Sequence, residues 1–63
     1  MKLANLTQIT DIVNDNTIII IRNTNFHMLT VGNWYQDNIL EYNDREIITF
    51  TWQNDNKLYI DIA

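Results

Sequence analysis

Few side chains in this sequence are of the types that carry out chemistry. Its 63 residues include one histidine and no cysteine. The histidine, His27, lies between Phe26 and Met28 on a predicted strand. An ordinary half-exposed position is the favoured interpretation of His27, and a metal anchor completed by distant carboxylates is the alternative.

The closest carboxylates along the chain argue against catalysis. Asp44 and Glu46 flank Arg45, whose positive charge favours the ionised form of both. Paired-carboxylate catalysis instead needs one carboxyl group that stays protonated. Gly-rich phosphate loops, nucleophile elbows and zinc-ligand spacings are missing from the sequence as well. We therefore predict that the protein is not an enzyme and has no catalytic residue, metal site or cofactor.

Aromatic and acidic residues gather in the least regular part of the chain. Trp and Tyr are enriched at binding hot spots because they combine a large apolar area with a polar group. Trp34 has a competing interpretation, in which it closes the end of the core. For Tyr35 and Tyr42, a core position and a binding position are equally favoured. The predicted partner-binding residues are Trp34, Tyr35, Asp37, Glu41, Tyr42 and Asp44.

Length and charge limit the classes of protein that fit. Four basic and eight acidic residues give a net charge of −4, which disfavours direct binding to nucleic acid. The longest apolar run, Ile18–Ile21, is far shorter than the roughly 20 residues of a membrane helix. A chain this small has a thin stability margin and no disulfides, so a homodimer is the default expectation. We expect a soluble, cytoplasmic protein.

Apolar spacing predicts the elements of the first two thirds. A helix of about three turns is predicted to end at Asn14–Asn16, and Thr17–Arg22 is a strand covered on both faces. After a short connection, Phe26–Val31 returns antiparallel. A short helix is expected over about Asp37–Tyr42. The apolar face of the first helix comprises Leu3, Leu6, Ile9, Ile12 and Val13.

The last third predicts a second hairpin. Ile48, Phe50 and Trp52 alternate with polar or outward positions, and after the turn Gln53–Asn56 a further strand carries Leu58, Ile60 and Ile62. We expect this apolar face to pack against the first helix.

These elements predict one α+β domain over residues 1–63. It is a four-stranded, mostly antiparallel sheet with an N-terminal helix on one face and a short second helix, in the order α-β-β-(α)-β-β. The opposite face is too apolar to be left in water, so the second helix should cover part of it and a second subunit or a target the rest. That face is predicted to carry two isoleucines of 18–21, half of 26–31, and Ile47, Thr49, Thr51 and Tyr59.

The segment 34–47, WYQDNILEYNDREI, carries a resemblance to a known group of proteins. Together with the Met1-Lys2-Leu3 opening that leads into Asn14–Thr17 and with the closing hairpin, it resembles very small proteins encoded by phages and prophages of Gram-positive bacteria. Several of those with an assigned role block host defence nucleases, including CRISPR effectors, by binding without catalysis. The resemblance implies an inhibitor or accessory binding protein and transfers no functional residue.

Two functions follow as hypotheses. The first is an anti-CRISPR-like inhibitor that binds the basic, nucleic-acid-receiving surface of a host defence nuclease through Asp37, Glu41 and Asp44, anchored by the neighbouring aromatic rings. The second is a small self-associating structural or assembly module of a phage, in which the apolar sheet face pairs with itself or with another phage protein.

Overall fold

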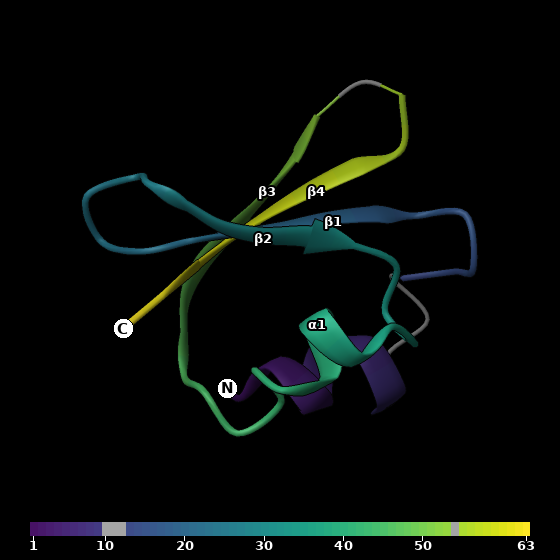
Figure 1. The fold of residues 1–63 in the computed structure, drawn as a ribbon, viewed down its shortest axis with the longest axis horizontal. Coiled ribbons are helices and arrows are strands. Elements are labelled where there is room, and N and C mark those ends of the chain that lie inside the picture. The colour runs from purple at the N-terminus through teal and green to yellow at the C-terminus, as the bar shows by residue number, and fades with distance from the viewer. Residues whose placement is uncertain (10–12, 54) are drawn as a thin grey trace.

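The computed structural model describes residues 1–9, 13–53 and 55–63, without the side chains of Gln8 and Ile9. Its strands form a single four-stranded sheet in the order β2-β1-β4-β3. The elements are the π-helix η1 (Asn5–Ile9), β1 (Ile18–Arg22), β2 (Met28–Gly32), α1 (Asp37–Leu40), β3 (Ile47–Gln53) and β4 (Lys57–Ile62). The four predicted strands are therefore present, in an α+β arrangement (Figure 1).

The sheet is mixed, because its two hairpins meet through a parallel pair. β1 pairs antiparallel with β2, and β3 pairs antiparallel with β4. In the centre, β1 and β4 run parallel, with Ile19 beside Leu58 and Ile21 beside Ile60. The expectation of a mostly antiparallel sheet left out this central pairing, which lets both of the most apolar strands lie in the middle of the sheet.

α1 is shorter than the sequence pattern predicts, and the predicted first helix is described only in part. Leu3 and Leu6 of the expected helical face are fully buried. The remaining residues of the predicted three-turn helix include 10–12, with Ile12, which lie outside the described residues, as does Asn54 of the second hairpin turn. α1 ends at Leu40 instead of Tyr42, because the next amides bond over three residues, from Tyr42 N to Ile39 O at 3.0 Å.

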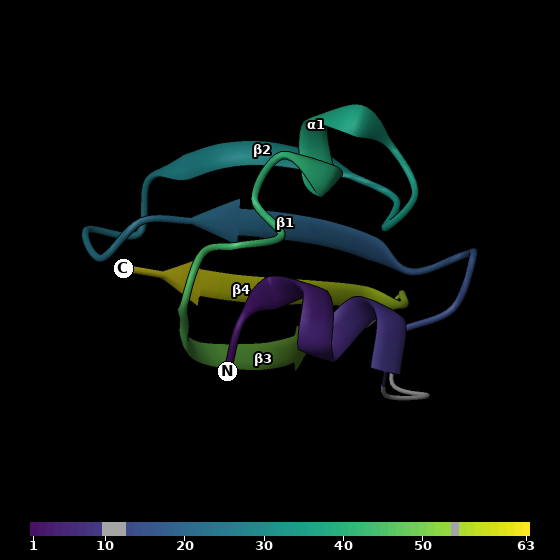
Figure 2. The same ribbon diagram turned by 90° about the horizontal axis from the view of Figure 1, so that it is seen from below.

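The core lies on one side of the sheet. The N-terminal segment and α1 both cover this same side, as Figures 1 and 2 show. α1 contributes Ile39, which is fully buried in the same cluster as Leu3 and Leu6. The expectation that the second helix covers the other face is therefore wrong, and that face has no helix over it in the described part of the chain. The sheet contributes Ile19, Ile21, Leu58, Ile60 and Ile62 to the cluster.

A β-bulge changes the faces of two isoleucines. The register of β3 against β4 shifts between Ile47 and Thr49, so one residue is inserted there. Ile47 pairs with Ile62 and packs against the core, whereas Ile48 is 57% exposed. The sequence analysis assigned these two residues the other way round, because strict alternation counted back from Phe50 places Ile48 inward.

Paired alanine substitutions test the bulge. Ile47→Ala is expected to lower the free energy of unfolding by about 1 to 2 kcal/mol, because it removes a side chain that packs on the core. Ile48→Ala is expected to change it by less than about 0.5 kcal/mol. Urea unfolding followed by circular dichroism measures both. Equal losses, or a larger loss for Ile48→Ala, would contradict the observed register.

Candidate functional site

Four of the six predicted partner-binding residues are exposed and lie in α1 or close to it in the sequence. Asp37 is the first residue of α1, and Glu41 follows its last residue. Tyr35 precedes the helix and is half exposed, and Asp44 lies in the turn that leads toward β3. We call these four residues, Tyr35, Asp37, Glu41 and Asp44, the acidic surface.

The other two predicted residues, Trp34 and Tyr42, pack against the core. Both rings are partly buried on the core cluster. The indole Nε1 of Trp34 donates a hydrogen bond to Asp15 Oδ1 at 2.9 Å, and its ring meets Tyr35 edge to face at 5.8 Å. The guanidinium of Arg45 lies 5.8 Å from the centre of the Tyr42 ring. These contacts fix both ends of the stretch 34–42, which carries Tyr35, Asp37 and Glu41 of the acidic surface, whereas Asp44 lies just beyond it.

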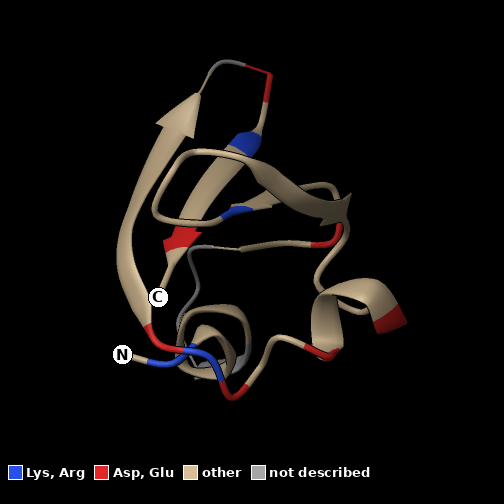
Figure 3. Cartoon of the chain, turned by 60° about the vertical axis from the view of Figure 1, so that its left-hand side comes forward, with Lys and Arg blue, Asp and Glu red and all other residues tan. Residues whose placement is uncertain are grey.

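The carboxylates of the acidic surface are not neutralised within the described part of the protein. The two ion pairs found there involve other carboxylates. Glu46 is bound by the Met1 amino group at 3.0 Å, and Asp61 is bound by Arg22 at 2.7 Å. Figure 3 shows acidic residues on α1 and in the turn after it, with no basic residue on the helix itself. The segment therefore presents negative charge to solvent.

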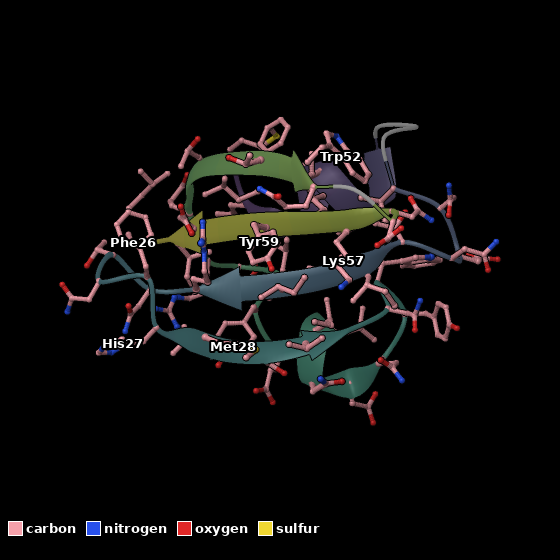
Figure 4. All side chains as sticks on the ribbon, turned by 90° about the horizontal axis from the view of Figure 1, so that it is seen from above. Phe26, His27, Met28, Trp52, Lys57 and Tyr59 are labelled. Carbon is pink, nitrogen blue, oxygen red and sulfur yellow. The ribbon has the colours of Figure 1, made fainter. Side chains whose placement is uncertain are left out.

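A second surface, absent from the sequence-based site, is the side of the sheet that carries no helix in the described ranges. Figure 4 looks onto it. We call it the open face, and in the register of the strands its central residues are Ile18, Ile20, Arg22, Leu29, Val31, Thr49, Thr51, Gln53, Lys57, Tyr59 and Asp61. Phe26, at 67% exposure, and Met28, at 63%, extend it at the end of the first hairpin. This face contains the residues that the sequence predicted for it, except that Ile47 faces the core and Ile48 faces outward instead.

Arg22 organises one end of the open face. Its Nε and Nη2 atoms donate to the two carboxylate oxygens of Asp61 at 2.7 and 3.2 Å. Its guanidinium carbon lies 4.8 Å from the centre of the Tyr59 ring and 5.2 Å from that of Phe26. A planar guanidinium suits such a setting because it stacks on rings while forming a two-pronged bond to carboxylate. The Asp61 side chain is 8% exposed, so this pair is largely removed from solvent.

The turn between β1 and β2 holds Phe26 beside Arg22. The Asn23 side-chain oxygen accepts hydrogen bonds from the backbone N–H groups of Asn25 and His27, at 2.9 and 3.0 Å. Within this turn Phe26 adopts a φ of 64°, the left-handed region that non-glycine residues seldom occupy. Nothing in the sequence indicated this placement, since Asn23–Asn25 predicted only a connection.

A pocket of about 160 Å³ lies between this turn and the β3 bulge. Its lining is mainly apolar and includes the outward-facing Ile48. Asp61 contributes to the lining, but its carboxylate is already bound by Arg22. The pocket therefore matches an apolar group more closely than a charged one. The remaining lining residues are Thr24, Phe26 and Thr49.

His27 and the acidic residues form no metal-binding group in the described residues. No cluster of three or more histidine, aspartate or glutamate side chains is placed there to hold an ion. His27 itself is exposed in the hairpin. None of the helices in the described ranges is long and apolar enough to span a membrane.

The described residues form a small protein with a four-stranded mixed sheet, short helical segments on one face of the sheet and none on the other. No protein-family model, curated protein or solved structure matches the chain. The two surfaces are therefore the basis for a functional proposal.

Proposed function

We propose that this protein is a non-enzymatic, phage-type inhibitor that binds a host defence nuclease of the kind found in CRISPR systems. The observation that carries the proposal is the exposed set Asp37, Glu41 and Asp44, which form no ion pair in the described part of the protein. A nuclease receives nucleic acid on a basic surface. Carboxylates that keep their charge unpaired are suited to occupy such a surface in place of phosphates.

The surroundings of the acidic surface favour binding with little rearrangement. Trp34 and Tyr42 pack on the core on either side of α1, so the stretch that carries Asp37 and Glu41 is anchored at both ends. Tyr35 is half exposed beside Asp37 and is available as an aromatic anchor. We place this activity in the host cytoplasm, with a protein as the partner and without direct contact to nucleic acid.

The proposal predicts that neutralising the acidic surface abolishes inhibition. The protein is expressed in bacterial strains that each carry one defined CRISPR effector, and the plating efficiency of a targeted phage is measured. We expect the protein to restore plating of the phage in at least one strain, which we call rescue. The variant D37N/E41Q/D44N should lose this effect. Binding to the purified effector should weaken by about ten-fold or more as salt rises from low to physiological strength.

Asp55→Asn is the matched control, because Asp55 is exposed and lies away from α1 in the turn before β4. It removes one negative charge and should leave rescue unchanged. Rescue that survives the triple substitution would refute the role of the acidic surface. Absence of rescue across the panel of effectors would refute the inhibitor proposal for those systems.

The open face favours a second candidate, a small assembly module of a phage. Leu29, Val31, Phe26 and Met28 present apolar area there, at the end and edge that the first hairpin forms. Exposed apolar patches of this kind mark contact with a protein partner, which includes a second copy of the chain. Sedimentation of wild-type protein and of Met28→Lys tests it. Association that Met28→Lys abolishes would favour the module, whereas an unchanged profile would count against pairing through this face.

A further inference from the structure

The two edges of the sheet differ in how they are protected. β2 forms one edge and is contacted by α1, whose Asn38 donates from Nδ2 to the backbone oxygen of Val31 at 2.9 Å and to Thr30 Oγ1 at 2.7 Å. β3 forms the other edge. Only its beginning is occupied in the described residues, where Ile47 N–H donates to Met1 O at 2.7 Å. Figure 2 shows the two edges, with α1 beside β2 and the chain start beside β3.

The outward-facing backbone groups of β3 follow from its register. Ile47 N–H points away from β4, and the alternation of an antiparallel strand turns every second residue the same way. The bulge adds one residue between Ile47 and Thr49, which shifts the alternation by one. Phe50 and Trp52 therefore present their N–H and C=O groups to the outer edge, while Thr49 and Thr51 direct theirs to β4.

We propose that two copies of this chain pair edge to edge through β3, antiparallel, with the two-fold axis at Thr51. Phe50 of each copy then lies opposite Trp52 of the other, and the outward N–H and C=O groups of both residues form hydrogen bonds. Antiparallel pairing of identical segments is self-complementary, as a two-fold interface requires. The result is a continuous eight-stranded sheet.

The side chains of β3 suit this register on both faces. Paired residues share a face, so Phe50 and Trp52 form two aromatic cross-strand pairs on the core side, where Trp52 is now 42% exposed. Thr51 meets Thr51 of the second copy on the open face, a favourable cross-strand pair. Thr49 of each copy likewise lies opposite Gln53 of the other copy on the open face.

Charge also favours a second copy at this edge. The chain has a net charge of −4, so two copies repel each other unless they meet through a neutral region. β3, with the sequence IITFTWQ, contains no charged residue over its seven positions.

This pairing does not depend on the inhibitor proposal or on the open face. Because α1 lies at β2, the opposite edge, a dimer through β3 carries its two copies of α1, each with Asp37, at its far ends. Each dimer is then able to contact two basic sites at once, which raises avidity without any new contact.

Charge substitution at Thr51 tests the proposal directly. Thr51 is exposed, so Thr51→Lys and Thr51→Glu are compatible with the monomer fold, which circular dichroism checks. In the dimer the two Thr51 Cα atoms are about 4.5 Å apart, so like charges there should weaken association by about ten-fold or more. An equal mixture of the two variants places opposite charges together and should restore dimers. Sedimentation velocity over a range of concentrations is the measurement.

Two further variants separate this geometry from other kinds of association. Trp52→Pro removes an outward N–H without removing a bond to β4, and should abolish dimers. Thr24→Lys, an equivalent change in the exposed β1–β2 turn, should leave them intact. A wild-type protein that stays monomeric, a Thr51→Lys variant that dimerises as wild type does, or a mixture that fails to recover would overturn the proposal. Loss of dimers in Met28→Lys with retention in Thr51→Lys would assign association to the open face instead.

Discussion

Replacing Ile60 with alanine is expected to remove a large part of the stability of this protein. Ile60 is fully buried in β4, in register with Ile21 on one side and Phe50 on the other. The substitution deletes buried methyl groups and leaves a cavity between two central strands, at a cost of about 3 to 4 kcal/mol. A chain of this length has a total free energy of unfolding of roughly 3 to 9 kcal/mol. The predicted result is therefore the loss of at least about a third of the free energy of unfolding, with a matching fall in the urea concentration at the midpoint of unfolding.

Val31→Ala is the control for Ile60→Ala, because Val31 lies on a strand of the same sheet but is 42% exposed. Urea titration followed by tryptophan fluorescence gives the two free energies of unfolding. We expect the control to lose about 1 kcal/mol or less. If Ile60→Ala lost no more than Val31→Ala, the parallel centre of the sheet would not be the core of the protein.

The second large effect is expected from Arg22→Met. The substitution leaves Asp61, a carboxylate that is 8% exposed, without the partner that now bonds both of its oxygens. Removing one member of a buried ion pair is costly because the other stays charged and desolvated, and the partial exposure of Arg22 reduces that cost to about 2 to 3 kcal/mol. The loss of stacking on Tyr59 and Phe26 adds to it. Thermal and urea unfolding of the single variant measure the loss.

The double variant R22M/D61N separates the pair from simple packing. With the charge removed from both positions, no uncompensated carboxylate remains, and stability should recover by about 1 to 2 kcal/mol relative to Arg22→Met. If the two side chains act independently, the loss of stability in the double variant equals the sum of the losses in Arg22→Met and in Asp61→Asn. That result would contradict the prediction.

The strands were predictable from the sequence, but the way they pair was not. Four isoleucines at 18–21 and the alternation at 58–62 predicted two apolar strands, and both are central in the sheet. The strand at 17–22 was expected to be covered on both faces, but one of its faces has no helix over it in the described residues. Periodicity within a segment carries no information on which hairpin strand lies beside which, so the parallel β1–β4 pair was missed. The bulge was missed for a related reason, because two adjacent isoleucines fit either face equally well until the register against Ile62 is known.

The predicted partner-binding residues likewise include some whose position could be predicted from the sequence and some whose position could not. Carboxylates at 37, 41 and 44 were placed on the surface by their charge, and they are exposed. Trp34 and Tyr42 have the same side-chain chemistry whether they bind a partner or close a core, so only the fold shows that both pack on Ile39 and its neighbours. The contact of Arg22 with Asp61 joins residues 39 positions apart, and it depends on the parallel pairing that local patterns do not reveal.

The parallel β1–β4 pair also affects the order in which the strands assemble. β1 lies 39 residues before the strand that completes its burial, as the span from Arg22 to Asp61 shows. Closing a loop of that length is slower than forming the local β1–β2 hairpin, so the early hairpin keeps one unsatisfied strand edge until β4 pairs with it. Such an edge is a site for mispairing between molecules that are still folding. Refolding at high protein concentration should therefore lower the yield of folded protein.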